Sequence, residues 1–238
     1  MKPLAVDLCC GLGGWSDGLL AEGWDVVGFD IERHQYGDDR YPAQLVLQDV
    51  LTLDGRQFRG KVSLIVASPP CQKYSYMAMP WKRAKALIAW YQDPAYPERI
   101  DELNAIFNAC KRIGAEAECP IIIENVRGAQ PWVGRSRWNY GSFHLFGDVP
   151  ALMPMVKKAQ KFNPDGTAHP PGSWFAIADS KNRGSKGIPH RTTGHWTNSM
   201  YRASHGSNAR KAASAMIAKI PYHLAKYIAA TFKPRLEQ

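Results

Sequence analysis

Long apolar runs, paired cysteines and metal-ligand spacings are all missing from this sequence. No apolar stretch approaches the roughly 18 residues needed to cross a membrane. We expect no signal peptide either, because the short apolar N-terminal stretch runs straight into a glycine turn. There is no CxxC pair, and His190, His195 and His205 are too loosely spaced to suggest a metal. We therefore expect a protein that binds neither a metal nor a membrane.

Cysteines and acidic residues are both scarce. Five cysteines at irregular spacing argue against a disulfide framework and for a reducing compartment such as the cytoplasm. Asp and Glu number 21 against 30 Lys and Arg, and the formal charge of +9 favours a polyanionic partner such as nucleic acid. A soluble protein that is basic for other reasons is the alternative. Hydrophobic residues make up 45% of the chain, which is enough for a globular core.

Short apolar runs alternate with helical patterns in the first half of the chain. The expected strands are residues 4–8, 26–29, 44–47, 62–67 and 121–123. The expected helices are 15–22, which Gly23 caps, and 98–117, which has one apolar face. Buried strands separated by helices are typical of a mostly parallel sheet, so we predict a doubly wound α/β fold.

The second half has a different character. From 151 to 214 the periodicity fades, and the stretch contains ten Lys or Arg but only two acidic residues. Apolar periodicity returns over 212–231 and predicts helical segments around Pro221. We therefore predict an α/β domain over 1–150, a small irregular basic region over 151–214, and a C-terminal helix over 215–238 that returns to the first domain.

Three strand ends carry groups suited to a nucleotide-like ligand. Residues 7–14 (DLCCGLGG) end a strand, turn on glycines and open a helix, which is the place of the ligand crevice in a doubly wound sheet. Asp30 ends the second strand and suits ribose hydroxyls, and Asp49 ends the third and could meet an adenine amino group. A tight turn that only needs small residues is the alternative. The lack of a GxxxxGK[ST] loop argues against a nucleoside triphosphate.

Two further strand ends carry reactive groups. Residues 68–75 (SPPCQKYS) follow the fourth strand, and two prolines stiffen a loop that presents Cys71. Residues 121–126 (IIIENV) form a buried strand that ends in Glu124 and Asn125, so a carboxylate could face the thiol across the crevice. Taken singly, Cys71 could be a buried packing residue and Glu124 a capping or solvated one. The three motifs in this order are far more specific than any one of them.

In these motifs the chain resembles the cytosine-C5 DNA methyltransferases, and most of all their compact bacteriophage-type members. The glycine turn, GFDIE, QDV, SPPCQ and ENV match the family's motifs in order, and the resemblance covers residues 4–150. It implies S-adenosylmethionine as cofactor and double-stranded DNA as partner, in the cytoplasm of a bacterial or phage-infected cell, with restriction–modification as one setting. The implied cofactor-binding residues are Asp7, Cys9, Gly11, Leu12, Gly13, Gly14, Asp30, Ile31, Asp49, Val50 and Pro70.

The family's last two motifs are matched only in part. Its Gln-x-Arg-x-Arg motif corresponds to VGRSR, where Arg135 and Arg137 fit the spacing but Val133 replaces the glutamine. These arginines could also contact phosphate or lie in a solvated loop. Its closing Gly-Asn motif is replaced by Ala218 and Lys219, so only the following proline and helix match.

The resemblance also implies a mechanism. Attack of the Cys71 thiolate on cytosine C6 activates C5, while protonated Glu124 holds N3. Asn125 positions the base or the cysteine loop, and Arg135 or Arg137 contacts O2. The C5–C6 face of a stacked base is inaccessible, so the target has to be flipped out of the duplex. We expect the protein to act as a monomer.

Two segments are candidates for holding DNA, and three rival functions stay open. Residues 74–91 mix tryptophans with cations, which suits a loop closing over DNA and equally a surface helix. The basic region 151–214 takes the place of the family's target-recognition domain. The same chemistry could act on RNA, or the scaffold could bind DNA without catalysis. A transferase acting on an exocyclic amine needs an aromatic residue where this chain has Cys71.

Overall fold

A seven-stranded sheet forms the centre of the molecule in a computed structural model that describes residues 2–154 and 208–234. Its strands are β1 (Leu4–Leu8), β2 (Asp25–Asp30), β5 (Gln44–Leu47), β6 (Leu64–Ala67), β7 (Ile121–Asn125), β8 (Trp138–Tyr140) and β9 (Phe143–Gly147). They lie in the order β5-β2-β1-β6-β7-β9-β8. The first five are parallel, and β9 is antiparallel to both of its neighbours. The prediction of a mostly parallel α/β sheet is confirmed.

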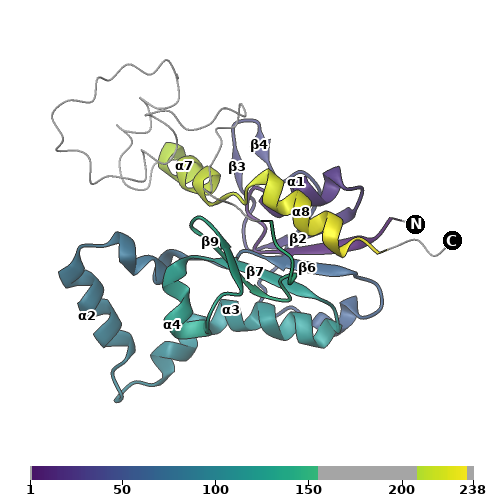
Figure 1. Cartoon of the computed structure of the whole chain (residues 1–238). Helices are drawn as coiled ribbons and strands as arrows, with labels where there is room; N and C mark the ends of the chain where they lie inside the picture. Colours follow the sequence, from purple (N-terminus) through teal and green to yellow (C-terminus); the bar gives the residue numbers. More distant parts are fainter. Residues whose placement is uncertain (1, 155–207, 235–238) are drawn as a thin grey trace.

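Helices cover both faces of this sheet (Figure 1). α1 (Gly14–Ala21) and α8 (Tyr222–Phe232) pack together on one face, and α3 (Glu98–Ala117) lies on the other. The side chains of β7 show why the strand is apolar throughout. Ile121 and Ile123 join the cluster under α3, whereas Ile122 joins the cluster under α1 and α8. A strand buried on both faces cannot alternate apolar and polar residues, which explains the run of three isoleucines.

The C-terminal helix packs against the first helix of the chain. α7 (Asn208–Ala218) leads into α8, which lies against α1. Gly18 makes this close approach possible, because a Cβ there would lie 2.4 Å from the backbone of Ala225. A Cβ on Gly14 would similarly meet the backbone nitrogen of Ile220 at 2.3 Å. The glycines of the first helix therefore serve helix packing as well as the turn.

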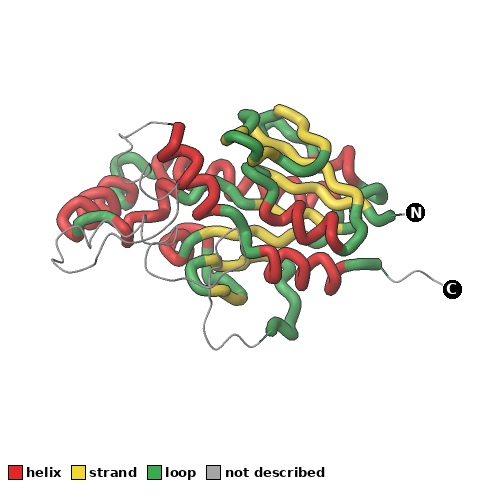
Figure 2. Tube along the Cα trace, turned by 90° about the horizontal axis from the view of Figure 1, so that it is seen from above, coloured by secondary structure: helices red, strands yellow, loops and turns green. Residues whose placement is uncertain are grey.

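The remaining elements lie around the edges of the sheet, and α2 projects to one side of the molecule (Figure 1 and Figure 2). They are the hairpin β3 (Gln35–Tyr36) and β4 (Asp39–Arg40), the 3-10 helices η1 (Gly55–Phe58), η2 (Gln72–Ala78) and η3 (Arg127–Ala129), and the helices α2 (Trp81–Tyr91) and α4 (Gln130–Val133). Of the two alternatives for residues 74–91, the structure shows a helix over the second part. No helix among the described residues is long and apolar enough to cross a membrane.

The expected elements and the observed ones agree closely in the first half. Strands 4–8 and 44–47 and helix 98–117 have the predicted bounds. The hairpins β3–β4 and β8–β9 were not predicted. The predicted boundary at residue 214 falls inside α7, while most of the basic region 151–214 lies outside the described residues.

Candidate active site

A cavity of about 600 Å³ opens where the parallel strands end. It contains residues that follow β1, β2, β5 and β6, and Glu124 near the end of β7. This is the edge at which doubly wound sheets bind their ligands. Of the predicted cofactor residues, nine line it: Cys9, Gly11, Leu12, Gly14, Asp30, Ile31, Asp49, Val50 and Pro70.

The turn after β1 depends on its glycines. Cys9, Gly11 and Gly13 all have positive φ, at 53°, 51° and 74°. The Gly13 N–H donates to the Cys10 carbonyl over 2.8 Å, which closes the turn, and Gly13 is then the N-cap of α1. The left-handed conformation is uncommon for residues with a side chain, so Cys9 occupies a strained position. The turn leaves the N–H of Gly11 directed at Asp30.

Asp30 is held as a carboxylate at the end of β2. It is 8% exposed, and its Oδ2 accepts from the Gly11 N–H at 2.9 Å. His34 Nε2 lies 3.6 Å from its Oδ1. Burial would raise the pKa of Asp30, but His34 and the Gly11 N–H outweigh it and keep the pKa below its usual range. The same contact raises the pKa of His34. An ionised carboxylate fixed at a cavity wall suits sugar hydroxyls.

Asp49 shapes the neighbouring turn. Its Oδ1 accepts from the Leu51 N–H at 2.9 Å, and its carbonyl accepts from Thr52. These bonds fix the segment after β5, so that Asp49 and Val50 both line the cavity. An acceptor and an apolar side chain side by side suit an adenine ring.

Asp7 and Gly13 do not line the cavity. Asp7 is fully buried and accepts a hydrogen bond from the Ser16 hydroxyl at 2.6 Å; Ser16 also contacts the Tyr41 hydroxyl at 2.7 Å. Burial raises the pKa of Asp7 well above its usual range, and Ser16 only partly offsets this. The Asp7 carboxyl therefore bonds to the first turn of α1 inside the protein and does not face the cavity.

Cys71 lies in the same cavity, on the loop after β6. It caps η2, and its carbonyl accepts from the Tyr74 N–H at 3.0 Å and from the Ser75 hydroxyl at 2.9 Å. Burial raises the pKa of the Cys71 thiol, and Glu124 raises it further, whereas Ser75 acts in the opposite direction. Glu124 lines the same cavity as Cys71.

β7 supplies one residue that lines the cavity and one that contacts the cysteine loop. Glu124 is 9% exposed and lines the cavity. Asn125 is fully buried, and its Nδ2 donates to the Pro69 carbonyl at 3.0 Å while its Oδ1 accepts from the Val126 N–H at 2.9 Å. Of the two roles predicted for Asn125, the structure therefore shows the contact with the cysteine loop.

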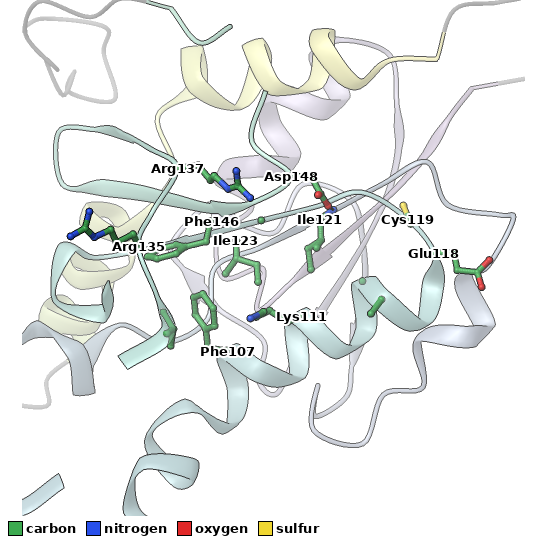
Figure 3. Close-up of a pocket in the computed structure, with 14 residues that line it drawn as sticks. Phe107, Lys111, Glu118, Cys119, Ile121, Ile123, Arg135, Arg137, Phe146 and Asp148 are labelled. Carbon is green, nitrogen blue, oxygen red and sulfur yellow. The ribbon is translucent and has the colours of Figure 1, made fainter. Parts of the chain in front are cut away.

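Arg135 and Arg137 are not brought to this cavity. Both are exposed and line a second cavity of about 580 Å³, between α3 and the strands β7 and β9 (Figure 3). Its floor is apolar and includes Phe107, Ile123 and Phe146. The physical reason is the antiparallel hairpin: β8 is the outermost strand and β9 separates it from β7, so the residues that lead into Trp138 are not adjacent to the end of β7. The O2 contact predicted for one of these arginines stays a prediction.

Sequence reasoning missed several residues of the first cavity. Tyr36 lies on the unpredicted strand β3, and His34 directly precedes that strand. Lys211 and Ala218 lie on α7, and Lys219 directly follows it. Ala218 and Lys219 thus line the crevice although they depart from the family's motif. The apolar periodicity of the C-terminal segment predicted the helices there, but not that α7 would form one wall of the cavity. Among the described residues no group of three His, Cys, Asp or Glu side chains could hold a metal ion.

Residues 4–84 match the sequence model of the C-5 cytosine-specific DNA methylases. No curated protein matches the chain. A crystal structure described as a DNA modification methyltransferase encoded within a prophage (E. coli) is 23% identical with a TM-score of 0.35, covering 54% of this chain and 33% of that one. The S. pombe Dnmt2 methyltransferase is 19% identical with a TM-score of 0.31, covering 54% and 35%.

The chain spans about a third of the length of these solved structures. The family match is confined to the first part of the chain, which includes the glycine turn, Asp30, Asp49 and the loop of Cys71. The resemblance to the C-5 cytosine-specific DNA methylases is confirmed for residues 4–84.

Proposed function

We propose that this chain is a DNA cytosine-C5 methyltransferase that uses S-adenosylmethionine. The observation that carries the proposal is the meeting of Cys71 and Glu124 in one cavity with Asp30 and Asp49. A thiol and a carboxylic acid are the nucleophile and the proton donor that this reaction needs. The family match over residues 4–84 supports the same reaction.

The residues of the cavity fit this cofactor. The Asp30 carboxylate, already held by the Gly11 N–H, suits the ribose hydroxyls, and Asp49 with Val50 suits the adenine. The glycine turn brings the backbone close to the ligand, and α7 closes the cavity from the other side. S-adenosylmethionine, when bound, supplies an electrophilic methyl group. A volume of about 600 Å³ lies within the range of small-molecule sites.

The chain's own groups carry the chemistry on the cytosine. The Cys71 thiol first loses its proton to solvent, and the thiolate then forms a bond to C6 as the C5–C6 double bond opens. Protonated Glu124 donates its proton to N3 and so offsets the charge that develops on the ring. C5, now electron-rich, takes the methyl group and then loses its proton to water or another base. The electron pair of that C–H bond restores the double bond as Cys71 leaves C6. The prolines at 69 and 70 and the Asn125 bond hold the sulfur in place throughout.

The target base has to leave the duplex to reach this cavity, because the stack covers its C5–C6 face. α2, which follows the cysteine loop, is suited to the flanking DNA. It carries Lys82, Arg83 and Lys85 but no acidic residue, and Trp81 is 71% exposed. We propose that its cations contact phosphates and that Trp81 packs against the opened duplex. Arg135 and Arg137 are assigned to phosphate contacts as well.

The test is methyl transfer by the purified protein. The unmutated chain, Cys71→Ser and the control Cys119→Ser would be incubated with labelled S-adenosylmethionine and unmethylated DNA, and the product nucleoside identified by mass spectrometry. We expect 5-methylcytosine from the unmutated chain and the control but not from Cys71→Ser. Cys119 is a suitable control because it lines the second cavity. Transfer to RNA alone would replace DNA as substrate, and transfer to neither would leave a DNA-binding scaffold.

A further inference from the structure

We infer that Tyr74 and Asn104 form a positioning pair that holds Cys71 opposite Glu124. This inference rests on the proposed function for its meaning, because it concerns how the nucleophile is aimed. Neither residue lines the cavity, so neither touches the cytosine or the methyl donor. Both act through the loop that carries the thiol.

Tyr74 is an anchor three residues beyond the nucleophile. It is 2% exposed, within the apolar cluster under α3. Its hydroxyl donates to Asn104 Oδ1 at 2.9 Å and lies 3.1 Å from the Leu103 carbonyl. Burial raises the pKa of Tyr74 to about 12, so the group remains a donor. A phenol buried this deeply needs a partner, and those found among the described residues belong to α3.

Asn104 extends the link to a third segment. Its Nδ2 donates to the Trp132 carbonyl at 3.2 Å, and Trp132 lies on α4, shortly after the strand that carries Glu124. The side chain of Asn104 is 5% exposed, and both ends of its amide are engaged. The amide therefore ties the cysteine loop and the segment after Glu124 to the same turn of α3.

A close backbone contact ties the same two segments directly. A Cβ on Gly128 would lie 2.0 Å from the Tyr74 carbonyl oxygen, so only glycine permits this approach. On the other side of the thiol, Asn125 holds the Pro69 carbonyl. Cys71 is thus bracketed between two fixed points, Pro69 and Tyr74, each bonded to a side chain outside the loop.

The short 3-10 turn couples the position of Tyr74 to that of Cys71. The Tyr74 N–H donates to the Cys71 carbonyl at 3.0 Å, so a displacement of Tyr74 moves Cys71 with it. The attack on C6 requires the sulfur at a defined distance and angle, and errors of about 1 Å in such geometry can lower rates about 100-fold. Loss of one hydroxyl in this pair should therefore affect the rate of chemistry more than the binding of either substrate.

The experiment compares Tyr74→Phe with Tyr91→Phe in the full chain. Tyr91 is a matched control because it is buried in the same cluster, and no hydrogen bond of its hydroxyl is found among the described residues. Three quantities would be measured: turnover at saturating DNA and methyl donor, the dissociation constant of the donor, and the rate of Cys71 alkylation by iodoacetamide, read by mass spectrometry. Thermal unfolding would show that each variant is folded.

For Tyr74→Phe we expect turnover at least about tenfold lower and an unchanged donor dissociation constant. Alkylation of Cys71 should be faster, because a released loop buries the thiol less. Tyr91→Phe should leave all three quantities as they are. Asn104→Leu should reproduce the effect, and the double variant should add little to it, since the two residues act as one link.

Equal behaviour of Tyr74→Phe and Tyr91→Phe in turnover and alkylation would overturn the inference. A fall in donor affinity of the same size as the fall in turnover would overturn it too, because it would indicate a general structural role. If the unmutated chain transfers no methyl group, the proposed function fails. The alkylation rates then still decide whether Tyr74 fixes the thiol.

Discussion

The two cavities described above lie on the same sheet but differ in the side chains that line their walls. The first, at the carboxyl ends of the strands, combines the glycine turn with acidic side chains and a thiol. The second, beside α3, has an apolar floor and three cations, Lys111, Arg135 and Arg137. None of these three forms an ion pair within residues 2–154 and 208–234.

The acidic groups of the second cavity are already engaged. Glu118 pairs with Arg59 at 3.0 Å, and Asp148 Oδ2 accepts from the Ile121 N–H at 2.9 Å. Its net charge is nevertheless positive, because Lys111, Arg135 and Arg137 outnumber Asp148, whereas the first cavity takes its carboxylates from Asp30, Glu32, Asp49 and Glu124. The difference shows that the reactive groups lie where the parallel strands end, whereas the cavity beside α3 carries positive charge suited to binding a polyanion. The predictions below test this division of chemistry and binding.

The largest effect is expected from Glu124→Gln. We expect methyl transfer to fall about 100- to 10,000-fold, because an amide cannot donate a proton as an acid does. The same change should make Cys71 more reactive towards iodoacetamide at neutral pH. Burial and Glu124 both raise the pKa of the thiol, so removal of the carboxylate lowers that pKa and increases the thiolate fraction.

The measurement is the pH profile of Cys71 alkylation beside the rate of methyl transfer. In the unmutated chain alkylation should rise with pH into the alkaline range, and the profile of Glu124→Gln should lie at lower pH. Glu32→Gln is the control, because Glu32 lines the same cavity but does not contribute to the pKa of Cys71. If the alkylation profiles of Glu124→Gln and the unmutated chain coincide, Glu124 does not affect the thiol. The two groups of the first cavity would then act independently.

The next effect concerns the methyl donor. Asp30→Asn should weaken donor binding about 10- to 100-fold, since hydrogen bonds to a charged group contribute about 1.5–3 kcal/mol. Isothermal titration would measure the affinity. NMR titration gives a second readout: the pKa of His34, raised by Asp30, should fall towards its usual value. An unchanged donor affinity together with a lowered His34 pKa would show that Asp30 only orders the turn.

Much of this site could be predicted because strand ends are visible in a sequence. An apolar run followed by Gly, Asp or Cys marks both the strand and the edge at which its last residue lies, and Asp30, Cys71 and Glu124 were all found in this way. The parallel order then places them together without further information.

The residues that were missed or misplaced depend on three-dimensional packing. Asp7 ends a strand too, yet its side chain points to Ser16 rather than to the cavity. Arg135 and Arg137 fit a motif by spacing, but the antiparallel register of β8 and β9, which spacing does not reveal, places them in the second cavity. The wall formed by Lys211 and Lys219 depends on how α8 packs on α1.

That packing leads to a smaller effect. Gly18→Ala should destabilise the protein by about 1–3 kcal/mol, because the added methyl group meets the backbone of Ala225 at 2.4 Å. If α8 shifts, the α7 wall of the first cavity shifts with it, and donor affinity should fall alongside stability. Denaturant unfolding and donor titration measure the two, with Ala21→Ser on the exposed face of α1 as control. A loss of stability without any loss of donor affinity would show that the packing of the C-terminal helix does not affect donor binding in the first cavity.

The smallest effect is expected in the second cavity. Replacement of Arg135 and Arg137 by alanine should weaken duplex binding modestly and leave turnover at saturating DNA unchanged. The salt dependence is the more direct measurement: the slope of log affinity against log salt should become shallower by about 0.9 for each phosphate contact that is lost. Arg56→Ala is the control, because Arg56 is exposed and already paired with Asp54 at 2.8 Å. A fall in turnover with an unaltered slope would place an arginine at the cytosine during the reaction, and the division between the two cavities would then hold only in the absence of DNA.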